Sequence, residues 1–121
     1  MSESKVVVVT GVSSGIGRIT AEKFTKQGWR VFGTVRNLTK TQPFAGVELI
    51  EMDVRDEDSV KRGIQSILDK TKRIDVLVNN AGGSLLGAME ETSIAEARAL
   101  FDTNFFGVLS TTKAVLPHMR D

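Results

Sequence analysis

The feature that most constrains the fold is a run of four valines that ends in a glycine-rich turn. Lys5 to Val9 is a continuous β-branched run, typical of a strand buried on both faces of a parallel sheet. Residues 15–27 follow with helical periodicity, and Gly28 is well placed to end that helix. The apolar residues that give this periodicity are Ile16, Ile19, Ala21 and Phe24. A strand, a glycine turn and a helix in this order predict the first unit of an α/β fold.

The rest of the chain continues to alternate between strands and helices. Further strands are predicted at Arg30 to Val35, Val47 to Met52 and Asp75 to Asn79, and helices at Asp56 to Thr71 and Ser93 to Met119. The segment 36–46 contains Pro43 and predicts only a short helix. The pattern does not decide whether the last helical stretch, 93–119, is continuous or interrupted. These elements predict one domain, residues 1–121, with a doubly wound parallel sheet of the Rossmann type that is truncated after four strands.

The composition excludes several classes of function. The chain has 16 basic and 15 acidic residues, so its charge gives no reason to propose nucleic acid or an anionic membrane as a partner. It has no cysteine and one histidine, His118, which excludes disulfides and thiolate catalysis and predicts no metal site. No apolar run approaches the ~20 residues that span a bilayer. We therefore expect a soluble, cytoplasmic protein without a membrane partner.

The loop after the first strand has the residue types that a phosphate-binding turn requires. It reads TGVSSGIG over residues 10–17. Glycines allow a tight turn and a close approach of the backbone to a pyrophosphate, and the N–H groups at the start of a helix favour an anion. The residues expected to contact the phosphates are Gly11, Ser13, Ser14, Gly15, Ile16 and Gly17. The alternative interpretation is a plain glycine turn.

Four motifs in chain order resemble the short-chain dehydrogenase/reductase family, and the resemblance covers essentially the whole chain. The first is the Gly-x-x-x-Gly-x-Gly spacing of the glycine turn with its preceding Thr10. The second is Asp53-Val54 after the third strand, and the third is Asn79-Asn80-Ala81-Gly82 after the fourth strand. The last is Asn104 within the final helical stretch.

The resemblance implies a role for each of these motifs in nicotinamide nucleotide binding or catalysis. Asp53 and Val54 would contact adenine, and Asn80, Ala81 and Gly82 would line the cofactor. Asn104 would be catalytic, because in this family such an asparagine perturbs the helix and frees a backbone carbonyl for a water linked to a lysine. Structural alternatives stay open: a turn or helix cap for Asp53, a tie between loops for residues 80–82, and a locally bonded amide for Asn104.

The residue type at the end of the second strand bears on the choice between NAD and NADP. NAD-specific sites place a carboxylate there for the ribose 2′-OH, but Glu22 is the only acid between Arg18 and Val47. Arg36 and Asn37 stand at that place, and a planar guanidinium suits a 2′-phosphate. The family's other marker of NADP preference, a basic residue just before the middle glycine of the turn, is absent, because Ser14 stands at that position. NADP(H) is therefore the predicted cofactor and NAD(H) the less favoured one, although Arg36 as an ordinary solvated arginine stays open.

The chemistry of this family needs residues that the chain lacks. It uses a serine and a Tyr-x-x-x-Lys pair, and this chain contains no tyrosine. We expect the parent protein to transfer hydride between NADP(H) and a small carbonyl or alcohol substrate, and this chain alone to be inactive. Alternatives are a non-catalytic NADP(H)-binding module and a purely structural domain. Because the fourth strand would be an edge, we also expect a homo-oligomer or pairing with a missing C-terminal half.

Overall fold

The four valines form the centre of a parallel sheet and send their side chains alternately to its two faces. They belong to β1 (Val6–Thr10), every residue of which is buried. Val6 and Val8 lie in one apolar cluster with Ile64 and Val115, and Val7 and Val9 lie in another. A strand that is apolar on both faces requires cover on both faces, so this run places the sheet in the middle of the molecule.

The computed structural model describes residues 4–44, 46–84 and 87–120, and within them one four-stranded sheet. The remaining strands are β2 (Arg30–Val35), β3 (Val47–Glu51) and β4 (Val76–Val78). All neighbours pair in parallel, in the order β3-β2-β1-β4. The predicted Rossmann-type sheet is thereby confirmed, and β4 is an edge strand as expected. β4 is shorter than the predicted segment 75–79.

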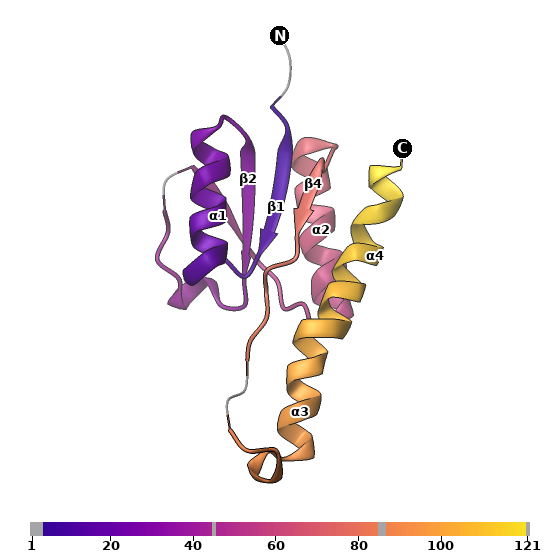
Figure 1. The fold of residues 1–121 in the computed structure, drawn as a ribbon. Helices are drawn as coiled ribbons and strands as arrows, with labels where there is room; N and C mark the ends of the chain where they lie inside the picture. Colours follow the sequence, from indigo (N-terminus) through magenta and orange to yellow (C-terminus); the bar gives the residue numbers. More distant parts are fainter. Residues whose placement is uncertain (1–3, 45, 85–86, 121) are drawn as a thin grey trace.

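Helices cover both faces of the sheet. α1 (Gly15–Lys26) packs on the face of Val7 and Val9, and α2 (Glu57–Thr71) and α4 (Gly107–Met119) pack on the other face. In Figure 1 the strand arrows point downwards, with α1 on one side of the sheet and α2 on the other. α3 (Ile94–Phe101) extends beyond the arrowheads, past the carboxyl ends of the strands.

The long predicted helix 93–119 is interrupted in its middle. Between α3 and α4 lies η3 (Asp102–Phe106), a turn of π-helix with Asn104 at its centre. Its wider spacing shows in the hydrogen bond from the Gly107 N–H to the carbonyl of Asp102, five residues back. A Cβ atom on Gly107 would lie 2.7 Å from Cγ2 of Val54, so glycine lets this turn approach the loop after β3.

The caps of the helices agree with the sequence signals in part. Asp56 is the N-cap of α2, and its side chain accepts hydrogen bonds from the N–H groups of Asp58 and Ser59. Ser93 and Glu96 form a capping box at the start of α3. Short 3₁₀ turns occur at η1 (Leu38–Lys40) and η2 (Met89–Glu91). η1 is the short helix expected in segment 36–46.

The helix predicted at residues 15–27 is confirmed as α1, but its apolar residues do not share one buried face. Ile16 and Ile19 are 77% and 57% exposed, whereas Ala21 is buried and Phe24 half-buried. The buried face consists of Gly17, Ala21 and Phe24, at the spacing i, i+4, i+7. The two isoleucines lie off that face, so they contribute little to the core.

Candidate functional site

The carboxyl ends of the strands surround a cavity of about 680 Å³. It is bounded by the loops that follow all four strands and by one side of α3. β1 leads to β2 on one side of the sheet, while β3 leads across to β4 on the other side. This is the topological switch point, where ligands bind in open α/β sheets, and the volume is typical of a ligand site.

The glycine turn after β1 is shaped by two left-handed residues and one tight contact. Gly11 has φ +70° and Gly15 has φ +63°, a region that side chains rarely adopt. Gly17 is buried at a point where a Cβ atom would collide with the carbonyl oxygen of Gly11 and with Nδ2 of Asn80. The three glycines therefore bring the start of α1 close to the ends of β1 and β4.

The first turn of α1 is open towards the cavity. Its N-cap, Ser14, makes no side-chain hydrogen bond to the helix, and no acidic residue stands in the first turn. Ser13 and Ser14 are exposed and line the cavity together with Ile16. Uncapped N–H groups, the positive end of the helix dipole and two hydroxyls form an arrangement that suits a phosphate.

Thr10 joins the end of β1 to the loop after β4. Its buried hydroxyl oxygen accepts hydrogen bonds from the N–H groups of Asn80 (3.0 Å) and Ala81 (2.9 Å). Nδ2 of Asn80 donates to the carbonyl of Gly11 at 2.9 Å. The Asn80 amide thus ties two loops together, the structural alternative that the sequence left open, while residues 80–82 also line the cavity.

The end of β2 presents a cation to the cavity. Arg36 is exposed, lines the cavity, and has no hydrogen bond or ion pair to any described residue. Asn37 does not line it: its side chain caps η1 and accepts from the N–H and Oγ1 of Thr39. A carboxylate of Glu51 accepts from the Leu38 N–H at 3.1 Å, so this acid is also engaged by the backbone.

The end of β3 presents a carboxylate that is held by an arginine two residues later. Oδ1 of Asp53 accepts from the N–H of Arg55 and from its Nε, both at 3.0 Å, and Oδ2 accepts from Nη2 at 2.9 Å. The Asp53 N–H donates to Oγ of Ser59 at 2.9 Å. The guanidinium of Arg55 lowers the pKa of Asp53, and Arg36 adds a weaker attraction. These contacts therefore favour the anionic form of Asp53 in the folded protein.

Asn104 lies behind the cavity wall rather than in it. Its Oδ1 accepts from the Gly83 N–H at 2.9 Å and its Nδ2 donates to the Gly83 carbonyl at 2.7 Å. It borders a second, more open depression next to Asn79 and Val108. The amide is bonded to Gly83, as in the structural alternative left open by the sequence, and a π-turn surrounds Asn104 where the resemblance implied a perturbed helix.

Most of the predicted binding residues meet at the cavity. Those that line it are Gly11, Ser13, Ser14, Ile16, Arg36, Asp53, Val54, Asn80, Ala81 and Gly82; those that do not are Gly15, Gly17, Asn37 and Asn104. Sequence reasoning missed Arg55 and the wall formed by Glu96, Ala99, Leu100 and Thr103 of α3 and its π-turn. The Asp-x-Arg spacing could have pointed to Arg55, whereas nothing in the helix pattern marks the α3 residues as cavity wall.

Comparison with known proteins identifies the family. The family model described as short chain dehydrogenase matches residues 5–121. The chain belongs to the short-chain dehydrogenase family. Among these proteins, the 3-ketodihydrosphingosine reductase of Bacteroides thetaiotaomicron is 39% identical over 98% of this chain and 43% of its own length.

Solved structures of dehydrogenases and reductases share the architecture. The ligand-free aldohexose dehydrogenase of Thermoplasma acidophilum is 39% identical with a TM-score of 0.89, over 98% of this chain and 46% of its own. An ElxO variant with NADPH bound is 34% identical with a TM-score of 0.89, over 98% and 51%. The 3-ketoacyl-(acyl-carrier-protein) reductase of Brucella melitensis, complexed with NADH, is 26% identical with a TM-score of 0.86, over 96% and 50%.

Two further facts bear on function. The chain spans about half the length of the curated relatives and solved structures that it matches. In the described ranges, no helix is both long and apolar enough to cross a bilayer, and no three acidic or histidine side chains are grouped so that they could hold a metal ion.

Proposed function

We propose that this chain binds NADP(H) and supplies the cofactor site of an oxidoreductase that acts on a small carbonyl or alcohol. The observation that carries the cofactor proposal is the position of Arg36. Its guanidinium lines the cavity at the end of β2, where an NAD site has a carboxylate, and no described side chain forms a hydrogen bond or ion pair with it. Such a cation attracts the 2′-phosphate that distinguishes NADP from NAD.

The residues present fit such a nucleotide along its length. The first turn of α1, with Ser13 and Ser14, would hold the pyrophosphate. Asp53 retains an acceptor for the amino group of adenine, and Arg36 would hold the 2′-phosphate. The bound nucleotide would supply a hydride at its nicotinamide ring. The small residues Ala81 and Gly82 would let the nucleotide approach the end of β4 closely.

The proposed reaction also requires a proton donor or acceptor that this chain does not contain. None of its 121 residues is a tyrosine, and the acid–base groups of Lys113 and His118 are exposed on α4 and do not line the cavity. We therefore propose that the chain by itself binds cofactor without turning over a ketone. The absence of tyrosine equally favours the second candidate, a non-catalytic NADP(H)-binding module.

A titration with the two reduced nucleotides tests the cofactor proposal. The fluorescence of NADPH or NADH is followed as protein is added, for the wild type and for Arg36→Ala. We expect the wild type to bind NADPH more tightly, and Arg36→Ala to lower the NADPH preference by about tenfold, the value of one charge-assisted hydrogen-bonded pair. Arg62→Ala, an exposed arginine on α2, is the matched control. Equal affinities in the wild type would contradict NADP preference, and no binding would contradict both candidates.

An assay with simple ketones then separates the two candidates. The pure chain with NADPH should show no oxidation of the nucleotide, and measured turnover would refute our proposal of inactivity. If a protein that continues this sequence with a Tyr-x-x-x-Lys pair reduces ketones, the oxidoreductase is supported. If the chain is complete as it stands and binds NADPH, the binding module is supported.

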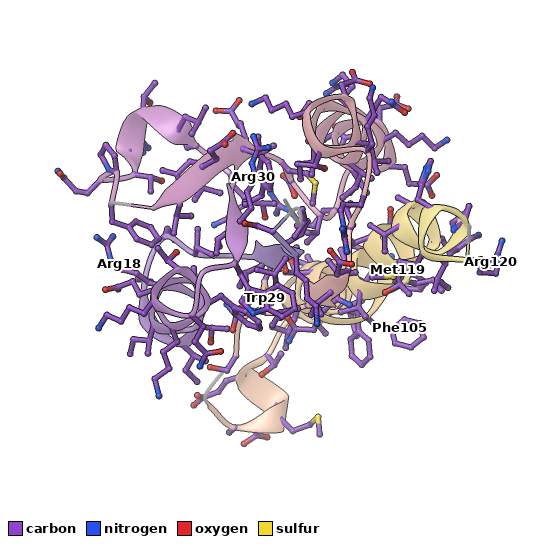
Figure 2. The ribbon with its side chains drawn as sticks, turned by 90° about the horizontal axis from the view of Figure 1, so that it is seen from above. Arg18, Trp29, Arg30, Phe105, Met119 and Arg120 are labelled. Atoms are coloured by element: carbon purple, nitrogen blue, oxygen red, sulfur yellow. The ribbon has the colours of Figure 1, made fainter. Side chains whose placement is uncertain are left out.

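We also propose an association surface. It would be formed by exposed apolar side chains of α3, η3 and α4: Phe101, Phe105, Phe106, Leu109 and Leu116. Figure 2 shows Phe105 projecting away from the rest of the molecule. Together with the unpaired edge of β4, this surface suits a second copy or a further part of the sheet.

A further inference from the structure

Arg36 and Asp53 attract each other electrostatically at the cavity. They follow the neighbouring strands β2 and β3, which remain joined at their ends by the hydrogen bond from the Met52 N–H to the Val35 carbonyl at 2.8 Å. Both residues line the same cavity. A free carboxylate at Asp53 would therefore be a competing partner for the Arg36 guanidinium, and each would neutralise the other.

Arg55 occupies this carboxylate. It makes three hydrogen bonds to Asp53, two from the guanidinium and one from its own backbone N–H. A carboxylate has about four lone-pair sites, so about one remains, and it is on Oδ2. Asp53 thus keeps room for a single further donor, such as the amino group of adenine, while its charge is compensated.

Two other acidic residues near the cavity, Glu96 and Asp102, interact with groups other than Arg36. Glu96 lines the cavity, but its Oε1 accepts from the Ser93 N–H in the capping box of α3. Asp102 interacts electrostatically with Arg55 and adds to the raised pKa of that guanidinium. Arg36 is left as the cation of the cavity whose charge is not paired within the described residues.

From this arrangement we infer that Arg55 is a positioning residue that determines the preference for a 2′-phosphate. It acts through Asp53: by pairing with that carboxylate it keeps Arg36 available to the ligand. The inference rests on the proposed function, because it concerns the same nucleotide site. The inference goes beyond the proposed function because it assigns selectivity to Arg55, a residue that need not touch the phosphate.

Four variants test the inference with the ratio of the dissociation constants for NADH and NADPH. In Arg55→Ala, Asp53 turns to Arg36, and we expect the ratio to fall about five- to tenfold, a coupling usual for contacting charged side chains. The double variant Asp53→Asn, Arg55→Ala has no competing carboxylate, so the ratio should return to within about twofold of the wild type. Asp53→Asn alone should leave the ratio at or above the wild-type value. Any loss of adenine contact affects both nucleotides and cancels in the ratio.

Arg55→Lys separates pairing geometry from charge. Lysine keeps the charge but cannot bind both carboxylate oxygens as a planar fork, so we expect a partial loss of selectivity. A wild-type ratio in Arg55→Lys together with a double variant as low as Arg55→Ala would overturn the inference, because Arg55 would then act by its charge alone. An unchanged ratio in Arg55→Ala, with its fold verified by circular dichroism, would also overturn it. If the wild type binds neither nucleotide, the proposed function fails first, and this inference fails with it.

Discussion

The side-chain amide of Asn104 pairs with the whole peptide unit of Gly83, one hydrogen bond to its N–H and one to its carbonyl. The two residues belong to different layers, the π-turn between α3 and α4 and the loop after β4. A Cβ atom at the neighbouring Gly82 would lie 2.8 Å from Oδ1 of Asn104, so this approach depends on glycine. The pair holds the loop of the cavity against the helical wall.

Asn104→Ala should loosen this wall. It leaves the Gly83 N–H and carbonyl without their partner, and we expect unfolding free energy to fall by about 1–2 kcal/mol. NADPH affinity should fall as well, because residues 81–84 line the cavity. Urea denaturation and the nucleotide titration measure the two effects. Asn79→Ala is the matched control, since Asn79 makes one exposed hydrogen bond to Thr112. Equal losses in both variants would show that the Gly83 pair has no special role.

Gly17→Ala adds only one methyl group, but it should lower both the stability of the protein and its NADPH affinity. The new methyl group collides with the Gly11 carbonyl and with Asn80, so the glycine turn or the loop after β4 must shift. Overpacking of this kind costs about 1–3 kcal/mol, and here it also displaces the proposed phosphate site.

Gly28→Ala provides the comparison for Gly17→Ala. Gly28 has φ +87° but nothing within 4 Å of an added Cβ, and it ends α1 far from the cavity. The variant Gly28→Ala should lose about 1 kcal/mol of unfolding free energy through backbone strain, while its NADPH affinity stays that of the wild type. Thermal unfolding and titration of both variants test the contrast. Undiminished NADPH binding in Gly17→Ala would contradict the proposed role of the turn.

The helices and strands could be predicted where the local sequence pattern and the tertiary environment favour the same secondary structure and the same burial. Val6 to Val9 required two covered faces, and the structure supplies both. In α1 the apolar spacing predicted the helix correctly but not its buried face, because the close approach of helix to sheet selects the small residues Gly17 and Ala21. Hydrophobicity alone does not carry that geometric requirement.

The site was predictable where one residue type has one structural use. The glycine turn and the residues that follow β2, β3 and β4 converge because carboxyl ends of parallel strands meet at one edge. The hydrogen-bond partners of these residues were harder to predict from the sequence. The sequence presents Asp53 and Arg55 as two separate charges, and only the turn at the start of α2 places them in a bidentate pair. The two acceptor bonds of Thr10 likewise depend on a loop 70 residues away.

The association surface predicts concentration-dependent assembly. Phe105 and Leu109 are 56% and 48% exposed on one helical layer, and water contact with such side chains is unfavourable. We expect a mass above 13.2 kDa by light scattering at high protein concentration. The variant Phe105→Glu, Leu109→Glu should shift it towards the monomer. Met89→Glu, at a 90% exposed residue outside α3 and α4, should not. A monomeric wild type at high concentration would count against the surface.

Asp75 predicts a specific acid sensitivity of the sheet. Its Oδ2 accepts from the Val6 N–H at 2.7 Å, and Arg73 donates to both carboxylate oxygens, so it joins the start of β1 to the segment before β4. The hydrogen bonds from Arg73 lower its pKa in the folded state. A depressed folded pKa contributes stability above the unfolded pKa, about 4, and that stability is lost as pH falls through the folded value. Asp75→Asn should therefore lower unfolding free energy by about 1 kcal/mol at pH 7 and flatten its decrease below pH 4.

Urea midpoints at pH 7, 4 and 3 measure the effect of Asp75→Asn, and they should converge with the wild type at the lowest pH. Asp69→Asn is the matched control, because Asp69 is an exposed carboxylate on α2 that accepts a hydrogen bond from the neutral side chain of Gln65. A parallel decrease of the wild type and Asp75→Asn between pH 4 and pH 3 would mean that other carboxylates account for the acid sensitivity, such as Asp53, whose pKa is also lowered in the folded protein.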